Sequence, residues 1–111
     1  MLPIEEEISR RENAARAAMK KVLGNPEDQW GATGFITHHL EVLDPKYWRK
    51  HLSTNTPSLT QVFDLLAIKR HWGGDAEIDV FDFGLPGAAT DYVIAVKFDN
   101  RGDIVEITME S

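Results

Sequence analysis

The chain has 111 residues, no cysteine and a formal net charge of −6 at pH 7. This length fits one domain that buries enough surface to fold without a disulfide or a cofactor. The lack of cysteine in the sequence excludes thiolate catalysis and thiolate metal sites, and it fits a reducing compartment, so we expect a cytoplasmic protein. Residues 5–7 are acidic where a secretory signal is basic, and no apolar run reaches the roughly 18 residues of a membrane span. We therefore expect no membrane association.

The net charge lies in the second half of the chain. Residues 1–55 contain eight Lys and Arg and eight Asp and Glu, whereas residues 56–111 contain four and ten. The second half therefore carries the whole charge of −6. Such a balance repels nucleic acid and attracts basic proteins.

The first predicted element is a long helix over residues 2–23. Its composition favours helix, with Ala, Glu, Arg, Lys and Met and no internal Gly. Glu6 with Arg10 and Glu7 with Arg11 have the i,i+4 spacing and the polarity that stabilise helices.

Three shorter helices are predicted next, over residues 35–43, 45–52 and 58–66. An apolar stripe marks the first of them, Asp44 and Pro45 provide an N-cap and a first helical residue for the second, and Pro57 or Ser58 starts the third.

After residue 66 the apolar period changes from about four to two, which indicates strands. We expect strands at residues 66–72, 77–83, 92–98 and 104–109, with turns at Gly73-Gly74-Asp75 and at residues 99–102. Both alternating sets of side chains in residues 92–98 are apolar at the centre, so this strand is expected to be central and covered on both faces. The predicted fold is a single α+β domain over residues 1–111, with N-terminal helices (1–66) packed on a four-stranded antiparallel β-meander (66–111).

His38, His39 and Glu41 form the nearest approach to a metal-ligand cluster. His38 and Glu41 stand at i,i+3 and share one helical face, but the sequence offers no third or fourth ligand at a suitable spacing. The alternative to a metal site is that one histidine is packed and hydrogen-bonded while the other is solvated. No metal, cofactor or catalytic residue is predicted, and His38 and Glu41 remain weak metal candidates.

Two further patterns suggest chemistry less strongly. The pairs Asp79 with Asp82 and Asp91 with Asp99 could divide acid and base roles, but such positions are usually solvated. The basic-aromatic segment at residues 46–50 could grip single-stranded nucleic acid, although its aromatic residues more often cover a core and the acidic second half opposes phosphate binding.

Several segments resemble a family of small bacterial proteins known only as a domain of unknown function. They are His38-His39-Leu40-Glu41, Pro45-Lys46-Tyr47-Trp48, Pro57 with Gln61-Val62 and Leu65-Leu66, Asp91-Tyr92-Val93, Phe98-Asp99-x-x-Gly102 and Ile107-Thr108-Met109-Glu110-Ser111. The similarity spans about residues 36–111. It implies an α+β fold in a bacterial cytosol and transfers no catalytic residue.

The leading hypothesis is a non-enzymatic module whose acidic sheet surface binds a basic protein partner, as in immunity proteins that neutralise basic toxins. The residues predicted to bind are Asp75, Glu77, Asp79, Asp91, Asp103 and Glu106. One alternative is a small metal-dependent enzyme or regulator that uses His38, His39 and Glu41. Another is a homodimer or structural module joined through the first helix or an edge strand.

Overall fold

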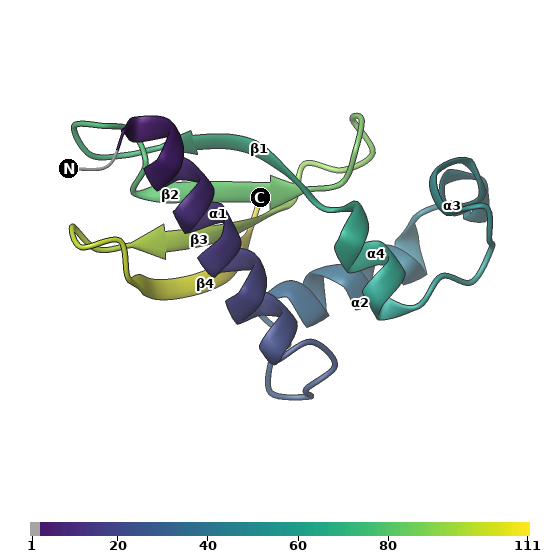
Figure 1. Cartoon of the computed structure of the whole chain (residues 1–111). Helices are drawn as coiled ribbons and strands as arrows, with labels where there is room; N and C mark the ends of the chain where they lie inside the picture. The colour runs from purple at the N-terminus through teal and green to yellow at the C-terminus, as the bar shows by residue number, and fades with distance from the viewer. Residues whose placement is uncertain (1–2) are drawn as a thin grey trace.

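The computed structural model describes residues 3–111, and it has the α+β fold that the sequence predicts. Four helices precede four strands (Figure 1). The helices are α1 (Ile4–Lys21), α2 (Ala32–Val42), α3 (Pro45–Leu52) and α4 (Leu59–Leu65). The strands are β1 (Ala67–Trp72), β2 (Val80–Gly84), β3 (Val93–Phe98) and β4 (Ile104–Glu110).

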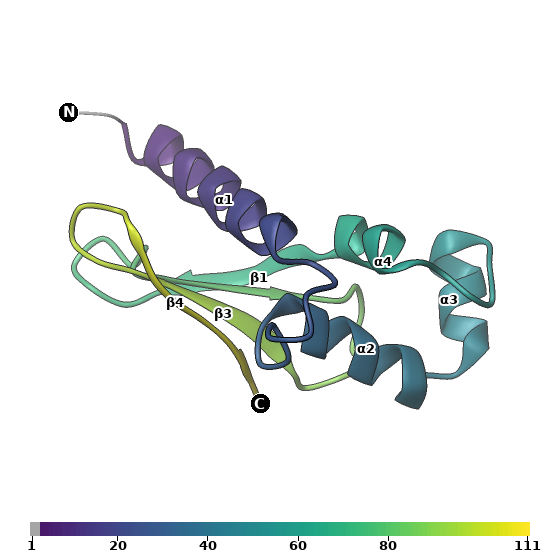
Figure 2. The ribbon, with the colours of Figure 1, turned by 90° about the horizontal axis from the view of Figure 1, so that it is seen from below.

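The sheet is an antiparallel meander in the order β1-β2-β3-β4, as predicted. Helix α1 runs across the sheet, whereas α2, α3 and α4 gather at one end of it (Figures 1 and 2). No helix of residues 3–111 is both long and apolar enough to cross a membrane.

Helix α1 forms the predicted pair of Glu7 with Arg11, whose atoms Oε2 and Nε lie 2.6 Å apart. Arg10 pairs with Glu7 at 2.8 Å rather than with Glu6, so one carboxylate serves two guanidinium groups. The predicted first residue, Leu2, lies outside the described residues.

Helix α2 begins at Ala32, three residues before the predicted start. The cause is Asp28, whose Oδ2 accepts hydrogen bonds from the backbone N–H and the hydroxyl of Thr33, at 3.1 and 2.7 Å. Helix α3 has the predicted bounds, with the Asp44 side chain accepting from Lys46 N–H. Helix α4 starts after Ser58 as predicted, in a capping box.

Strand β2 begins at Val80, so the prediction of a strand from Glu77 was wrong. The Asp79 N–H donates to the Gly73 carbonyl at 3.2 Å, which closes a broad turn over residues 73–79. Glu77 has a φ of 58° inside this turn, a left-handed conformation that a strand residue does not adopt.

The two faces of the sheet differ, although the centre of β3 is buried on both of them, as predicted. Ile94 and Val96 on one face and Ala95 on the other are at most 3% exposed. The core face carries Phe81, Phe83, Ile94 and Val96, all fully buried with side chains from α1 and α2. Cross-strand pairing aligns the opposite face in the row Arg70, Asp82, Ala95 and Thr108 and in the row Trp72, Val80, Lys97 and Glu106. We call this second face the open face, because Trp72 is 43% exposed there and the Arg70 side chain 69% exposed.

Candidate functional site

A buried carboxylate lies at the centre of the open face. Asp82 on β2 is only 3% exposed. Its Oδ2 accepts one hydrogen bond from Arg70 Nε at 2.7 Å and another from Trp72 Nε1 at 3.0 Å. The Arg70 guanidinium carbon also lies 5.4 Å from the centre of the Trp72 ring, within cation–π range. One buried acid therefore fixes two exposed side chains against each other.

This arrangement follows from register. Arg70 and Asp82 are direct cross-strand partners, and Trp72 lies two residues along β1 on the same face. Both donors therefore reach Asp82 from the neighbouring strand. An irregularity in the pairing between Ile68 and Arg70 sets this register.

The open face has a hollow beside this cluster, and the volume of the hollow is about 500 Å³. Val93 and Ala95 contribute apolar surface, and Trp72 contributes an aromatic ring. The full lining consists of Lys69, Arg70, Trp72, Asp82, Asp91, Val93, Ala95, Lys97, Glu110 and Ser111. A hollow of this size with a few convergent polar groups has the dimensions of a binding site.

Two of the hollow's three cations are neutralised within the face. Arg70 pairs with Asp82, and Lys97 Nζ lies 3.0 Å from Glu106 Oε2, which raises the pKa of Lys97. Lys69 Nζ donates instead to the Gly87 carbonyl at 3.2 Å. Asp91 and Glu110 have no ion-pair partner among residues 3–111. The groups of the hollow without an ion-pair partner among the described residues are therefore two acids, Asp91 and Glu110, and one cation, Lys69.

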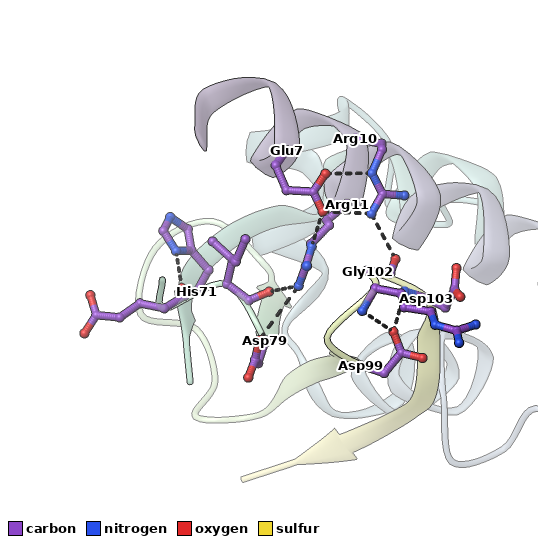
Figure 3. Close-up of polar contacts among 11 residues, drawn as sticks. Glu7, Arg10, Arg11, His71, Asp79, Asp99, Gly102 and Asp103 are labelled. Atoms are coloured by element: carbon purple, nitrogen blue, oxygen red, sulfur yellow. Dashed lines mark hydrogen bonds and ion pairs between the residues drawn. The ribbon is translucent and has the colours of Figure 1, made fainter. Parts of the chain in front are cut away.

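The six acids predicted to bind a partner lie at three different places. Asp91 lines the hollow, and Glu106 is on the open face in its pair with Lys97. The remaining four, Asp75, Glu77, Asp79 and Asp103, belong to the turns 73–79 and 99–103, which we call the hairpin end (Figure 3). Because the strands alternate in direction, Asp91 lies at the opposite end of the sheet from this group.

At the hairpin end the polar contacts join the turns to α1 (Figure 3). Arg11 is 5% exposed, and its Nη1 donates to the Ile78 carbonyl at 2.8 Å and lies 3.9 Å from Asp79 Oδ1. Arg10 donates to the Gly102 carbonyl at 3.2 Å. The two arginines therefore fasten α1 to both turns.

Glu7 and Asp99 stabilise the hairpin end from opposite sides. Hydrogen bonds from Arg10 and Arg11 lower the pKa of Glu7 to about 2. Backbone N–H groups of Asp103 and Arg101 donate to Asp99 and lower its pKa. Gly102 completes this turn with a φ of 83°, as the sequence predicts. These contacts hold the two turns and α1 together.

His38, His39 and Glu41 do not assemble into a metal site. No three His, Asp or Glu residues within residues 3–111 are placed to hold a metal ion together. His39 is fully buried, and both of its ring nitrogens are hydrogen-bonded within the protein. His38 is partly exposed and Glu41 exposed. The prediction of one packed, hydrogen-bonded histidine is confirmed for His39, whereas His38, expected to be solvated, is only partly exposed and lies edge-on to the Tyr92 ring at 5.5 Å.

The acid pairs considered from the sequence are also separated. Asp82 is on the open face, whereas Asp79 faces Arg11 at the hairpin end. Asp91 and Asp99 flank β3 at its two ends, so a strand of six residues separates them. In the basic-aromatic segment, Trp48 is 1% exposed and belongs to the core.

The sequence analysis missed Asp82, Arg70 and Trp72 as a group. An acid in the middle of the apolar run Val80-Phe81-Asp82-Phe83 was the available signal, because a charged residue between buried neighbours needs a partner. A strand was predicted at residues 66–72, but the register that brings Arg70 and Trp72 to Asp82 does not follow from the sequence.

Comparisons with protein-family models, with curated proteins and with solved structures found no match to this chain. The resemblance over residues 36–111 therefore stays a prediction.

Proposed function

We propose that this chain is a non-enzymatic protein-binding module that docks a basic protein on the open face of its sheet. The observation that supports the proposal is the buried Asp82, which orients an exposed tryptophan and an exposed arginine beside the hollow. Trp and Arg are the residues most enriched among those that dominate binding energy at interfaces. A pair held in place before binding loses less conformational entropy when the partner arrives.

Stability alone gives little reason for this cluster. A buried ion pair is often no more stabilising than apolar residues of similar size. Asp82 lies on a central strand between Phe81 and Phe83, where an apolar side chain is the simpler choice. The cluster therefore favours a role at the surface over a role in folding.

Charge indicates the kind of partner. The hollow keeps Asp91 and Glu110 without ion-pair partners among the described residues, and the chain as a whole carries −6. Complementary charge speeds association and disfavours wrong partners. An immunity-type protein against a basic toxin is one form of this proposal, and the general form is a docking face for a basic protein.

The test is a titration followed by NMR amide shifts, with a synthetic peptide of alternating lysine and glycine as the probe. We expect shifts in β1, in residues 91–97 and at Glu110, and none with a glutamate-glycine peptide of equal length. Shifts confined to the hairpin end, or equal shifts with both peptides, would contradict the proposal.

Matched variants sharpen this titration. Asp91→Asn is expected to weaken binding by up to about fivefold, which is the range of one exposed ion pair. Asp64→Asn removes the same charge from an exposed position on α4 and is expected to change nothing. Neutralising Asp75, Glu77 and Asp103 together tests the hairpin end, and a larger loss there than at Asp91 would move the site away from the open face.

A further inference from the structure

His39 joins α2 to the segment that connects β2 and β3. Its Nδ1 lies 2.6 Å from the Phe35 carbonyl oxygen, and its Nε2 lies 2.9 Å from Thr90 Oγ1. A carbonyl only accepts, so Nδ1 carries the hydrogen. The neutral ring therefore uses Nε2 to accept the hydrogen of the Thr90 hydroxyl.

In this state Thr90 uses its one hydrogen and one of the two lone pairs of its oxygen. Its oxygen accepts the N–H of Tyr92 at 3.2 Å while its hydrogen goes to His39. The rest of the segment is held by two other side chains, since Tyr47 Oη donates to the Pro86 carbonyl at 2.8 Å and Lys69 to the Gly87 carbonyl. The contact with His39 is thus the tie nearest β3, beside Asp91 in the wall of the hollow.

Protonation of His39 would disrupt this arrangement. Nε2 would then carry a hydrogen, and the Thr90 hydroxyl would have to turn its own hydrogen away to a new acceptor. Burial disfavours the charged ring and lowers the pKa of His39, which the neighbouring His38 lowers further.

The groups that face the His39 ring offer no compensating negative charge. On its own helix these are Phe35, at 4.2 Å between ring centres, and His38, at 5.1 Å. From the segment before β3 it is Tyr92, at 5.9 Å, whose hydroxyl is the only titratable group that this segment presents to the ring among the described contacts.

We propose that His39 is an acid-sensitive latch, whose protonation releases residues 88–92 from α2 and loosens the Asp91 wall of the hollow. The release of this segment is inferred from the contacts of His39 alone. Its effect on partner binding rests on the proposed function.

The test measures amide hydrogen exchange of Tyr92 and its neighbours by NMR between pH 7.5 and pH 5.0, as protection relative to the unstructured chain. We expect protection in residues 88–92 to fall by about tenfold per pH unit once His39 titrates, while the centre of β3 keeps its protection. The ring nitrogen spectrum at pH 7.5 is expected to show the Nδ1–H form.

Two variants serve as control and comparison. His38→Gln removes the adjacent histidine and is expected to keep the pH response. Thr90→Val removes the hydroxyl partner and is expected to give low protection in residues 88–92 at both pH values. Unchanged protection in the native protein across this range, or an equal fall in every strand, would overturn the latch.

Binding of the lysine-glycine peptide at the two pH values separates the two proposals. Loop release without peptide binding at pH 7.5 would overturn the proposed function and keep the latch. Peptide binding on the open face at both pH values, with no loop release, would overturn the latch and keep the proposed function.

Discussion

Phe81 and Asp82 are neighbours on β2, yet they belong to two different surfaces. Phe81 points into the core and is fully buried among apolar side chains. Asp82 points to the open face and is almost as buried, but beneath the exposed side chains of Arg70 and Trp72. The same degree of burial therefore has different energetic consequences. Burial of Phe81 removes apolar surface from water, whereas burial of Asp82 removes a charge from water.

The core face of the sheet therefore determines stability, whereas the open face determines what the surface can bind. The hairpin end lies between these cases, because its buried Arg11 is a charge that connects α1 to the turns. Changes on the core face, at the hairpin end and on the open face should therefore reduce stability in that order.

The largest expected effect is that of Phe81→Ala. Removing a fully buried aromatic ring is expected to cost about 3–5 kcal/mol of unfolding free energy, through lost burial and the cavity left behind. Urea unfolding followed by circular dichroism measures this cost. Val105→Ala, at a position 63% exposed, is the control and is expected to change stability by less than about 0.5 kcal/mol. A cost below about 1 kcal/mol for Phe81→Ala would contradict the comparison.

The next effect is that of Glu7→Gln at the hairpin end. It is expected to cost about 2 kcal/mol at pH 7, because the buried Arg11 loses its charged partner. The pKa of Glu7 is lowered to about 2 from 4.5, so its contribution is complete above pH 4.5 and is lost as the pH falls toward 2.

The difference in unfolding free energy between Glu7→Gln and the native protein should therefore shrink steadily from pH 4.5 to pH 2. Urea unfolding at several pH values measures it. Glu6→Gln is the matched control on an exposed position of the same helix turn. A gap that stays constant over this pH range would show that the ion pairs of Glu7 do not stabilise the fold.

A smaller effect is expected for Asp82→Asn. Arg70 loses its charged partner but is already 69% exposed at its side chain, so water replaces the carboxylate and the cost is about 1 kcal/mol or less. The tryptophan fluorescence should change, because Trp72 loses a charged acceptor for its indole N–H. A cost as large as that of Phe81→Ala would place Asp82 among the residues that stabilise the fold.

The smallest effect on stability is expected for Trp72→Ala, at a few tenths of a kcal/mol, since the ring is 43% exposed. The same change is expected to weaken binding of the lysine-glycine peptide about tenfold, as loss of an interface hot spot does. Trp30→Ala removes an even more exposed tryptophan outside the sheet and is the control for both measurements. Equal effects of the two substitutions on binding would remove the special role of Trp72.

The fold class and most helix positions follow from the sequence. The apolar period and the caps are local signals, so Asp44-Pro45 and Ser58 gave two helix starts directly. The turn glycine at residue 102 did the same for the last hairpin. Local signals gave wrong element boundaries where a contact across a loop sets the boundary. Examples are the hydrogen bonds of Asp28 before α2 and the turn that closes at Asp79 before β2.

Only the tertiary structure decided which face of the sheet stays open and which acids lie together. An alternating strand pattern shows that two faces exist, but it does not say what buries each one. In β3 the helices bury Ile94 and Val96, whereas Ala95 is buried on the face that carries Arg70 and Trp72. The position of Asp82 was visible in the sequence, whereas its partners depend on the register of β1 against β2. Counting charges along the sequence likewise showed that the second half is acidic. The direction of the strands places Asp91 at the opposite end of the sheet from the four acids of the hairpin end.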